Sequence, residues 1–242
     1  MAAYRFVLAV TCAGVLALLA AAPPAAAVAP CTSPISPARS HAWRAYVPPL
    51  TPIRTRFKQH AASAPITLEG AWRLALGARR TPTGTCLVRI RLNRRPNTAR
   101  AWVAAQHVRL SRTLWRIEVR RATRRLTLLR RGRAVRRWRV VVGKPATPTP
   151  TGLFAIQASY RTPPSSFSGS WILALTAHSE ILTTFDGGDG QVALHGRGGA
   201  SLANPLGTAA SHGCVRLANA AITSIVHRIG RGRLQGVPLA IR

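Results

Sequence analysis

The sequence of 242 residues has very few acidic side chains: five Asp and Glu stand against 35 Lys and Arg, and the formal net charge is +30. Lysine is scarce too, since Lys58 and Lys144 are the only two, so nearly every basic side chain is Arg. A charge of this size favours polyanions as partners. The helix-turn-helix, RNP and zinc-finger patterns of nucleic-acid-binding proteins are absent, which argues against nucleic acid as that partner.

The basic side chains are unevenly distributed along the chain. Residues 1–152 hold 28 basic and two acidic side chains, whereas residues 153–220 hold three of each. The chain therefore contains a neutral stretch inside a strongly basic protein. We interpret most of the remaining arginines as a solvated surface, and binding of an anionic wall polymer is the alternative.

Cysteine is also scarce, with four residues in the chain. Zinc sites usually take a second pair of cysteines or a His-Glu-x-x-His sequence, and neither is present. Three residues that lie close in sequence, His195, His212 and Cys214, could ligate zinc, but they do not complete either pattern. We therefore predict no metal site.

Residues 1–27 have the pattern of an export signal. Arg5 supplies a short positive region, a mostly apolar stretch follows it, and three alanines at 25–27 offer a cleavage site. We predict a protein that is cleaved near Ala27 and exported to the cell envelope, the periplasm or the extracellular wall. The alternative is an uncleaved signal that anchors the chain in the membrane, although the apolar stretch is slightly short for a span.

Export also constrains the cysteines. Cys12 would leave with the signal, and three cysteines would remain. An odd number outside the cell implies one free reactive thiol. Cys214 is the natural candidate for that thiol, which leaves Cys31 and Cys86 as a possible disulfide.

The rest of the chain divides into three segments. Residues 28–60 contain six prolines and are predicted to be a linker. Residues 61–113 are predicted to form a small β module, because apolar and charged residues alternate at 88–92. Residues 114–242 form the last domain, which begins with a hairpin pattern and ends with a strand.

One helix is predicted in the last domain. Its apolar residues Ile222, Ile225, Val226 and Ile229 recur at helical spacing. Asn219 suits the start of this helix and Gly230 suits its end. Upstream, residues 160–190 are rich in Ser, Pro and Gly and are predicted to be mostly loop.

The most informative motif is Ser-His-Gly-Cys-Val-Arg at 211–216, with His195-Gly196 upstream of it. A cysteine nucleophile needs a base that takes its proton and backbone N–H groups that hold the oxyanion. His195 could be the base, and the tight turn at Gly213 could present the N–H groups.

This motif resembles the L,D-transpeptidases of the YkuD type. That family has a His, a gap of some fifteen residues, then Ser or Thr followed by His-Gly-Cys, and here residues 196–210 form the gap. The resemblance covers residues 115–242 and implies a mainly β fold: a YkuD-like β-sandwich catalytic domain with a short helix after the Cys motif. The module at 61–113 loosely resembles an SH3-like domain at 101–110.

The resemblance implies a role for each catalytic residue. Cys214 attacks a peptide carbonyl, and His195 takes the thiol proton and later protonates the leaving amine. No acidic residue stands beside His195, so the backbone carbonyl of Gly196 would orient its ring. The N–H groups of Cys214 and Gly213 would form the oxyanion hole.

Three further residues of the motif are expected on the substrate side. His212 and Ser211 would face the substrate, and Arg216 would either support the site or bind a substrate carboxylate. In the resembled family a flap over the active site lies in the part of the chain that corresponds to residues 160–190.

The implied reaction is peptidoglycan cross-linking without a cofactor. A tetrapeptide stem would acylate Cys214 with loss of D-Ala, and the amine of a second stem would resolve the thioester into a 3→3 link. The alternatives are resolution by water, which gives an L,D-carboxypeptidase, and resolution by a wall-attached protein. A non-enzymatic wall-binding protein is the other class, and the combination of His195 with Cys214 argues against it.

Overall fold

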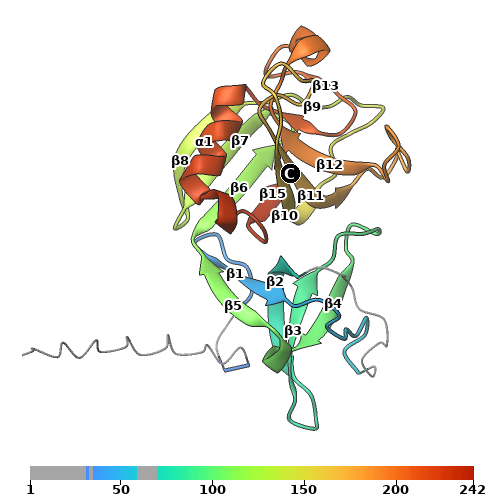
Figure 1. The fold of residues 1–242 in the computed structure, drawn as a ribbon, viewed down its shortest axis with the longest axis vertical. Coiled ribbons are helices and arrows are strands. Elements are labelled where there is room, and N and C mark those ends of the chain that lie inside the picture. Colours follow the sequence, from blue (N-terminus) through green and yellow to red (C-terminus); the bar gives the residue numbers. More distant parts are fainter. Residues whose placement is uncertain (1–30, 33–34, 59–69) are drawn as a thin grey trace, which may run out of the picture.

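The computed structural model describes residues 31–32, 35–58 and 70–242, which form the two β-rich units seen in Figure 1. The predicted export signal at 1–27 lies outside the described residues. No helix in the described part of the chain is long and apolar enough to cross a membrane. The fold is mainly β with one α-helix after the Cys motif, as predicted.

The N-terminal unit is a five-stranded antiparallel sheet with the strand order β4-β3-β2-β1-β5. Its core consists of apolar side chains from one face of β3 and its neighbours, Val88 and Ile90 among them. The strands are β1 (Ala42–Val47), β2 (Ala71–Arg80), β3 (Cys86–Arg91), β4 (Arg100–Ala104) and β5 (Arg109–Thr113), with a 3₁₀ turn at Ala105–His107.

The prediction of a linker at 28–60 is wrong for its central part. Residues 42–47 form β1, which lies inside the sheet between β2 and β5. Ile35 is buried in the core of the same unit. The segment alternates buried and half-buried positions, and pairing with two strands outweighs the prolines, which lie outside residues 42–47. The N-terminal unit therefore begins well before residue 61.

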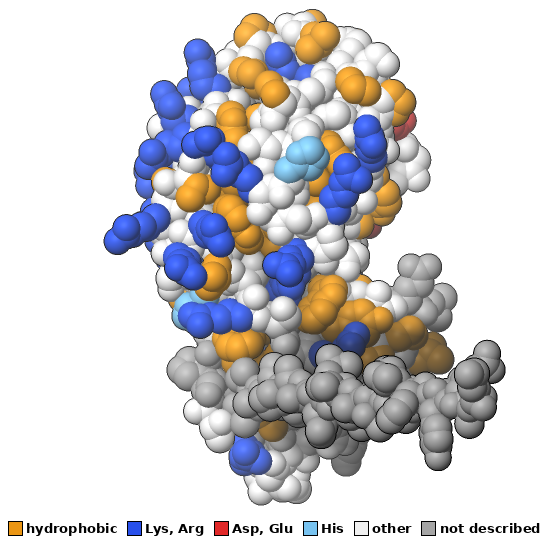
Figure 2. Space-filling view, turned by 60° about the vertical axis from the view of Figure 1, so that its left-hand side comes forward, with side chains coloured by type: hydrophobic (Ala, Val, Ile, Leu, Met, Phe, Trp, Pro, Cys, Tyr) orange, Lys and Arg blue, Asp and Glu red, His pale blue; other side chains and the backbone are white. Residues whose placement is uncertain are grey.

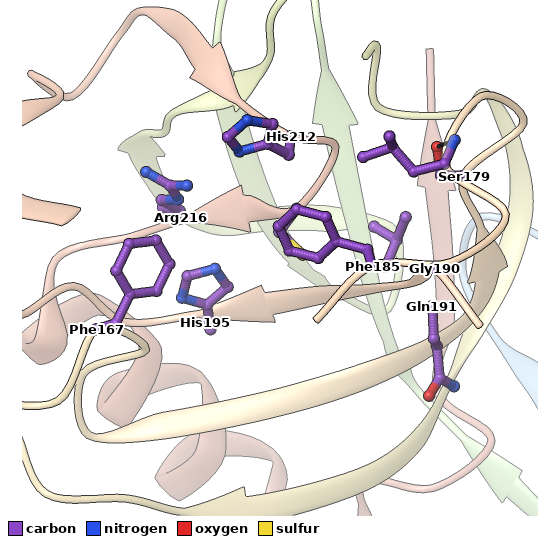
Figure 3. A pocket seen from close by; sticks show the side chains of 11 residues that line it. Phe167, Ser179, Phe185, Gly190, Gln191, His195, His212 and Arg216 are labelled. Carbon is purple, nitrogen blue, oxygen red and sulfur yellow. Dashed lines mark hydrogen bonds between the residues drawn. The ribbon is translucent and has the colours of Figure 1, made fainter. Parts of the chain in front are cut away.

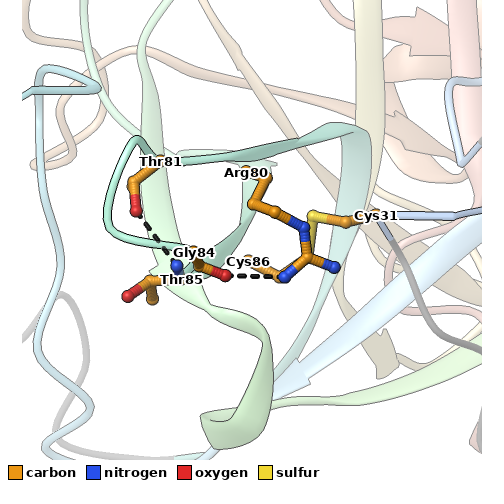
Figure 4. The surroundings of a disulfide bond; sticks show 6 residues. All are labelled: Cys31, Arg80, Thr81, Gly84, Thr85 and Cys86. Carbon is orange, nitrogen blue, oxygen red and sulfur yellow. Dashed lines mark hydrogen bonds between the residues drawn. A yellow bond between two sulfur atoms is a disulfide. The ribbon is translucent and has the colours of Figure 1, made fainter.

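The predicted disulfide between Cys31 and Cys86 is present. Figure 4 shows it at the start of β3, beside the turn that joins β2 to β3. In that turn Arg80 donates a hydrogen bond of 2.6 Å to the Gly84 carbonyl, and the N–H of Thr85 donates to Thr81. The disulfide ties the segment before β1 to the N-terminal sheet.

Replacing Cys31 and Cys86 together by Ser is expected to lower the free energy of unfolding of the N-terminal unit by about 2–4 kcal/mol. The reason is that the bond joins residues 55 positions apart and restricts the unfolded chain. Denaturant unfolding followed by Trp fluorescence measures the change. A Cys214→Ala control should unfold like the wild type, and an unchanged midpoint in the double variant would contradict the prediction.

The C-terminal unit is an eight-stranded sheet with the strand order β14-β12-β11-β10-β15-β6-β7-β8. A second, two-stranded sheet pairs β9 with β13. The strands are β6 (Trp115–Arg120), β7 (Arg125–Arg130), β8 (Arg133–Arg139), β9 (Val142–Gly143), β10 (Gly152–Arg161), β11 (Trp171–His178), β12 (Gln191–His195), β13 (Ala209–Ser211), β14 (Val215–Arg216) and β15 (Pro238–Ile241).

Helix α1 (Asn219–Ile229) packs its apolar face against this sheet, and Gly230 ends it as predicted. Short 3₁₀ turns lie at Gly199–Ala203 and Arg231–Arg233. The expectation of loop across 160–190 is wrong for 171–178, which form the buried strand β11. The true loops are residues 162–170 and 179–190, on either side of that strand.

Several arginines lie between the two units and not on a solvated surface. Arg91 is buried and donates hydrogen bonds to the carbonyls of Asn97 and Leu153. Arg44 is also buried and donates to the Arg233 carbonyl at 2.8 Å. Burial lowers the pKa of both guanidinium groups below the usual value. The charged face of the N-terminal sheet therefore forms part of the interface with the C-terminal unit.

Candidate active site

Cys214 comes directly before strand β14, and His195 is the last residue of the neighbouring strand β12. β14 pairs in parallel with β12, which sets Val215 opposite Leu194 and Arg216 opposite His195. The N–H of Ala193 on β12 points at the Cys214 sulfur, 3.4 Å away. As a result, Cys214 and His195 both line one pocket.

Internal hydrogen bonds hold the turn before Cys214. The Ser211 hydroxyl donates to the Cys214 carbonyl at 2.6 Å and accepts the N–H of Gly213 at 3.2 Å. Gly213 has φ +124°, a conformation that favours glycine. Ser211 was predicted to face the substrate, but its side chain is fully buried and points into this turn. The Gly213 N–H is engaged by Ser211, which leaves the Cys214 N–H as the predicted oxyanion donor.

A second turn, at residues 147–152, supports the turn that precedes Cys214. The Thr149 hydroxyl donates to the Gly213 carbonyl at 2.8 Å and accepts the N–H of Gly143 at 2.8 Å. The N–H of Lys144 donates to the Ser211 carbonyl at 2.9 Å. The turn is part of the site's framework, a role that depends on pairing 64 residues away.

His195 is oriented by its own backbone neighbour. Its Nδ1 lies 2.8 Å from the Gly196 carbonyl oxygen, which selects the tautomer with hydrogen on Nδ1 and leaves Nε2 as an acceptor. The side chain is 4% exposed. Burial lowers its pKa to about 4, against the raising effect of the Gly196 hydrogen bond, and the nearby Arg216 lowers it further.

Burial acts on the thiol in the opposite direction. It raises the pKa of Cys214, and this effect outweighs the Ala193 N–H and the positive charge of Arg216, both of which favour thiolate. With a low His195 pKa and a high Cys214 pKa, the resting pair is a neutral imidazole and a neutral thiol.

Arg216 is a buried clamp at the edge of the pocket. It is 4% exposed, and its Nη1 donates a 2.7 Å hydrogen bond to Asn204 Oδ1. Its guanidinium lies 4.8 Å from the centre of the Phe167 ring, as Figure 3 shows on the side of the pocket where His195 lies. The structure thus supports the local supporting role, although the side chain still lines the pocket.

Two exposed aromatic rings cover the pocket from the two loops beside β11. Phe167 lies 6.2 Å from the His195 ring, and Phe185 lies 5.4 Å from the ring of His212. Residues 179–190, which we term the roof loop, contribute Ser179, Leu182, Phe185 and Gly190 to the lining. His212 is exposed at the rim, where a substrate-facing role is sterically open (Figure 3).

Sequence analysis missed the role of Asn219. It is the first residue of α1, but Ala218 is the N-cap, and the Asn219 side chain turns back to the site. Its Oδ1 accepts the N–H groups of Ser170 and Arg197 at 3.0 and 3.1 Å, and its Nδ2 donates to the carbonyls of Arg197 and Pro164. Asn219 therefore joins the loop at 162–170 to the chain that follows His195.

Replacing Asn219 by Ala is expected to lower the free energy of unfolding of the C-terminal unit by about 2–4 kcal/mol, because two N–H groups and two carbonyls lose their partner. Thermal and denaturant unfolding measure the change. Asn219→Asp keeps the acceptor and should lose less, while His227→Ala on the exposed face of α1 should lose almost nothing. Equal stability of Asn219→Ala and His227→Ala would contradict the role assigned to this side chain.

Fold and site together define a β-rich catalytic domain with a cysteine and a buried, carbonyl-oriented histidine in one pocket. The sequence matches the YkuD family, the L,D-transpeptidase catalytic domain, over residues 115–237. The chain belongs to this family. The match begins at the first residue of β6 and leaves out the N-terminal sheet, so the SH3-like resemblance of that sheet stays a prediction.

Solved structures of L,D-transpeptidases are similar to parts of the chain. A mutant enzyme from Enterococcus faecium is 17% identical, with a TM-score of 0.36 over 53% of this chain and 49% of that chain. L,D-transpeptidase 3 from Mycobacterium tuberculosis is 16% identical, with a TM-score of 0.41 over 60% and 75%. An enzyme from Mycobacterium smegmatis is 14% identical, with a TM-score of 0.40 over 81% and 93%.

The chain thus spans about half the length of the E. faecium protein. Among curated proteins none matches the sequence.

Proposed function

We propose that this protein is a peptidoglycan L,D-transpeptidase that forms 3→3 cross-links through a thioester on Cys214. The observation that carries the proposal is the pocket shared by Cys214 and His195, with Nδ1 of His195 held by the Gly196 carbonyl. Membership of the L,D-transpeptidase family supports it. The predicted export to the cell envelope would place the enzyme beside its substrate.

Acylation uses the neutral pair. Nε2 of His195 takes the proton from the Cys214 thiol as the sulfur attacks the carbonyl carbon of the third residue of a tetrapeptide stem. The N–H of Cys214 stabilises the oxyanion. The His195 imidazolium then gives its proton to the amine of D-Ala, the C–N bond breaks, and the acyl group remains on sulfur.

Deacylation reverses the proton path. The side-chain amine of a second stem attacks the thioester carbonyl, and His195 takes a proton from that amine. The new amide forms, the C–S bond breaks, and the sulfur recovers its proton. Water in place of the amine would give a carboxypeptidase, and an amine of a wall protein would give an anchored protein.

The size of the pocket constrains where the donor lies. The cavity is about 60 Å³, well below the roughly 300–1,000 Å³ of ordinary ligand pockets. The donor stem would therefore lie across the opening between Phe167 and Phe185, with only its scissile carbonyl reaching the sulfur, or it would displace the roof loop.

The test is incubation of the protein with a disaccharide-tetrapeptide, followed by mass spectrometry of the products. A dimer that lacks one D-Ala supports transpeptidation. Release of D-Ala without a dimer supports the carboxypeptidase alternative. If a folded protein with a reduced thiol releases no D-Ala, the proposal is wrong and a wall-binding role is favoured.

A further inference from the structure

The loop that joins β3 to β4 contacts the catalytic unit through side chains. This loop, residues 92–99, is closed at its base by hydrogen bonds between Leu92 and Ala99 and between Ala99 and Pro96. The side-chain amide of Asn97 pairs with the backbone of His178 at the end of β11: Nδ2 donates to the carbonyl, and Oδ1 accepts the N–H, both at 2.8 Å. Asn97 thus acts as an extra strand partner at the point where the roof loop begins.

Arg95 holds the next part of the roof loop. Its Nη2 donates to the carbonyls of Ser179 and Leu182 at 2.9 and 3.1 Å. The Ser179 hydroxyl in turn accepts the N–H groups of Ile181 and Leu182. The first turn of the roof loop is therefore fixed both from inside and from the N-terminal unit.

The far end of the roof loop has a third contact. Gln191, the residue after it, donates a 2.9 Å hydrogen bond to Asn93 Oδ1 and a 2.7 Å bond to the Leu175 carbonyl. The neck of the loop is closed by the N–H of Ser179, which donates to the Gly190 carbonyl at 2.9 Å. Both ends of the loop are thus anchored by residues 93–97.

We propose that Asn93, Arg95 and Asn97 are positioning residues for the roof loop, so that the N-terminal unit is part of the catalytic machinery although it does not line the pocket. The roof loop lines the pocket and sets Phe185 beside His212. This inference rests on the proposed function for its effect on turnover, whereas the anchoring itself is independent of the reaction.

The test compares Arg95→Ala and Asn97→Ala with two matched controls, Arg94→Ala and Thr98→Ala, which alter exposed neighbours in the same loop. Hydrogen exchange of the intact protein measures the roof loop directly. Loss of an anchor is expected to speed exchange at 179–190 about tenfold and to leave the loop at 162–170 unchanged. Exchange equal to that of the controls would overturn the proposal.

Kinetics separate positioning from general damage. In the anchor variants we expect the KM for the tetrapeptide donor to rise about tenfold with a smaller change in kcat, while Cys214 is alkylated by iodoacetamide no more slowly than in the wild type. Arg95→Lys should raise the KM less than Arg95→Ala, because its ammonium can still reach one of the two carbonyls. An inactive wild type would refute the proposed function. Hydrogen exchange at 179–190 would still show whether residues 93–97 anchor the roof loop.

A different observation carries a second inference, about the hairpin of β7 and β8. Residues 120–139 contain ten arginines and no acidic residue. The pairing sets Arg125 directly opposite Arg139 and Arg130 opposite Arg133. Like charges in these positions destabilise a sheet. None of the ion pairs formed within the described residues involves this hairpin.

The hairpin lies at an open edge of the sheet, with β8 as the last strand. Figure 2 shows basic side chains gathered along one flank of the catalytic unit. No large hydrophobic side chain is exposed in this hairpin, so it lacks the apolar anchors of a membrane-binding surface. Guanidinium groups match phosphate through paired hydrogen bonds.

We infer that the β7–β8 hairpin binds a linear, phosphate-bearing polyanion, whose repeating charges relieve the repulsion between the paired arginines. Strand β8 has seven residues, which span about 23 Å, so several charges of one polymer chain can be met at once. The surface is separate from the pocket lining, and binding would hold the enzyme close to an anionic polymer.

The probe is linear inorganic polyphosphate, titrated onto the full protein at several salt concentrations. In the hairpin variant, Arg125→Gln and Arg133→Gln remove one member of each arginine pair, and Arg137→Gln removes a third charge from β8. Arg94→Gln, Arg100→Gln and Arg112→Gln combined are the charge-matched control on the N-terminal unit. The hairpin variant should lose at least tenfold in affinity, and its salt slope should fall by about two. Equal losses in both variants, or binding to anionic vesicles but not to polyphosphate, would overturn the inference.

Discussion

Replacing Cys214 by Ala is expected to lower the rate of D-Ala release from the tetrapeptide by at least about 10⁴-fold, a loss typical of a removed nucleophile. In the proposed reaction the sulfur carries the acyl group, and Ala offers no nucleophile in its place. The structure predicts little change in stability, because the turn is held by the Ser211 and Thr149 hydrogen bonds, which involve backbone groups at 213 and 214.

Quantitative mass spectrometry of released D-Ala measures this loss, and thermal unfolding controls for the fold. Cys214→Ser is the sharper control, because it retains a nucleophile of nearly the same shape whose proton is far harder to remove. It should be almost as inactive as Cys214→Ala. Substantial turnover in a Cys214→Ala protein would show that another group attacks the carbonyl.

His195 is expected to give the second large effect, a loss of about 10³- to 10⁴-fold on substitution by Ala. The base works only when its imidazole is neutral. Because burial lowers the His195 pKa to about 4, activity should persist down to about pH 5 and fall as the pH drops through 4. An ordinary histidine would lose activity near pH 6.5.

The neutral resting pair also predicts how the rate of Cys214 alkylation depends on pH at the alkaline end. Since burial raises the Cys214 pKa, alkylation by iodoacetamide should keep increasing above the ordinary thiol pKa. A thiolate–imidazolium pair would instead give a plateau that begins below pH 6. Measured rates that form such a plateau would contradict the neutral resting pair.

Acid unfolding has to be separated from this activity loss. The His195 pKa is lower in the folded protein than in the unfolded chain, so the unfolded state binds the proton first. The stability contribution is therefore complete above about pH 6.5 and is lost as the pH falls towards 4. Activity should be measured by brief exposure to acid, with recovery at pH 7 as the control.

The arrangement of the site could be predicted from sequence because it is local. The Cys motif, the strand that ends at His195 and the helix that ends at Gly230 each follow from short-range spacing. The orientation of His195 by Gly196 also lies between neighbours. The Cys31–Cys86 disulfide followed from the number of cysteines: with Cys12 in the export signal and Cys214 as the free thiol, two remain.

What sequence analysis missed depends on distant partners. The strand at 42–47 was hidden among prolines and exists because two other strands pair with it. The strand at 171–178 was obscured by Ser and Gly on both sides, although its own residues are mostly apolar. The contacts of Asn97, Arg95 and Asn219 follow from no short-range pattern, because their partners lie 22 to 87 residues away.

The measurement that tests the central claim most directly is trapping of the acyl-enzyme. The protein is mixed with the tetrapeptide donor, quenched in acid within seconds, digested and analysed by mass spectrometry. We expect the peptide that contains Cys214 to gain the mass of the donor minus D-Ala, and the adduct to be absent from Cys214→Ala. Release of D-Ala with no adduct on Cys214, or an adduct on another residue, would contradict the account.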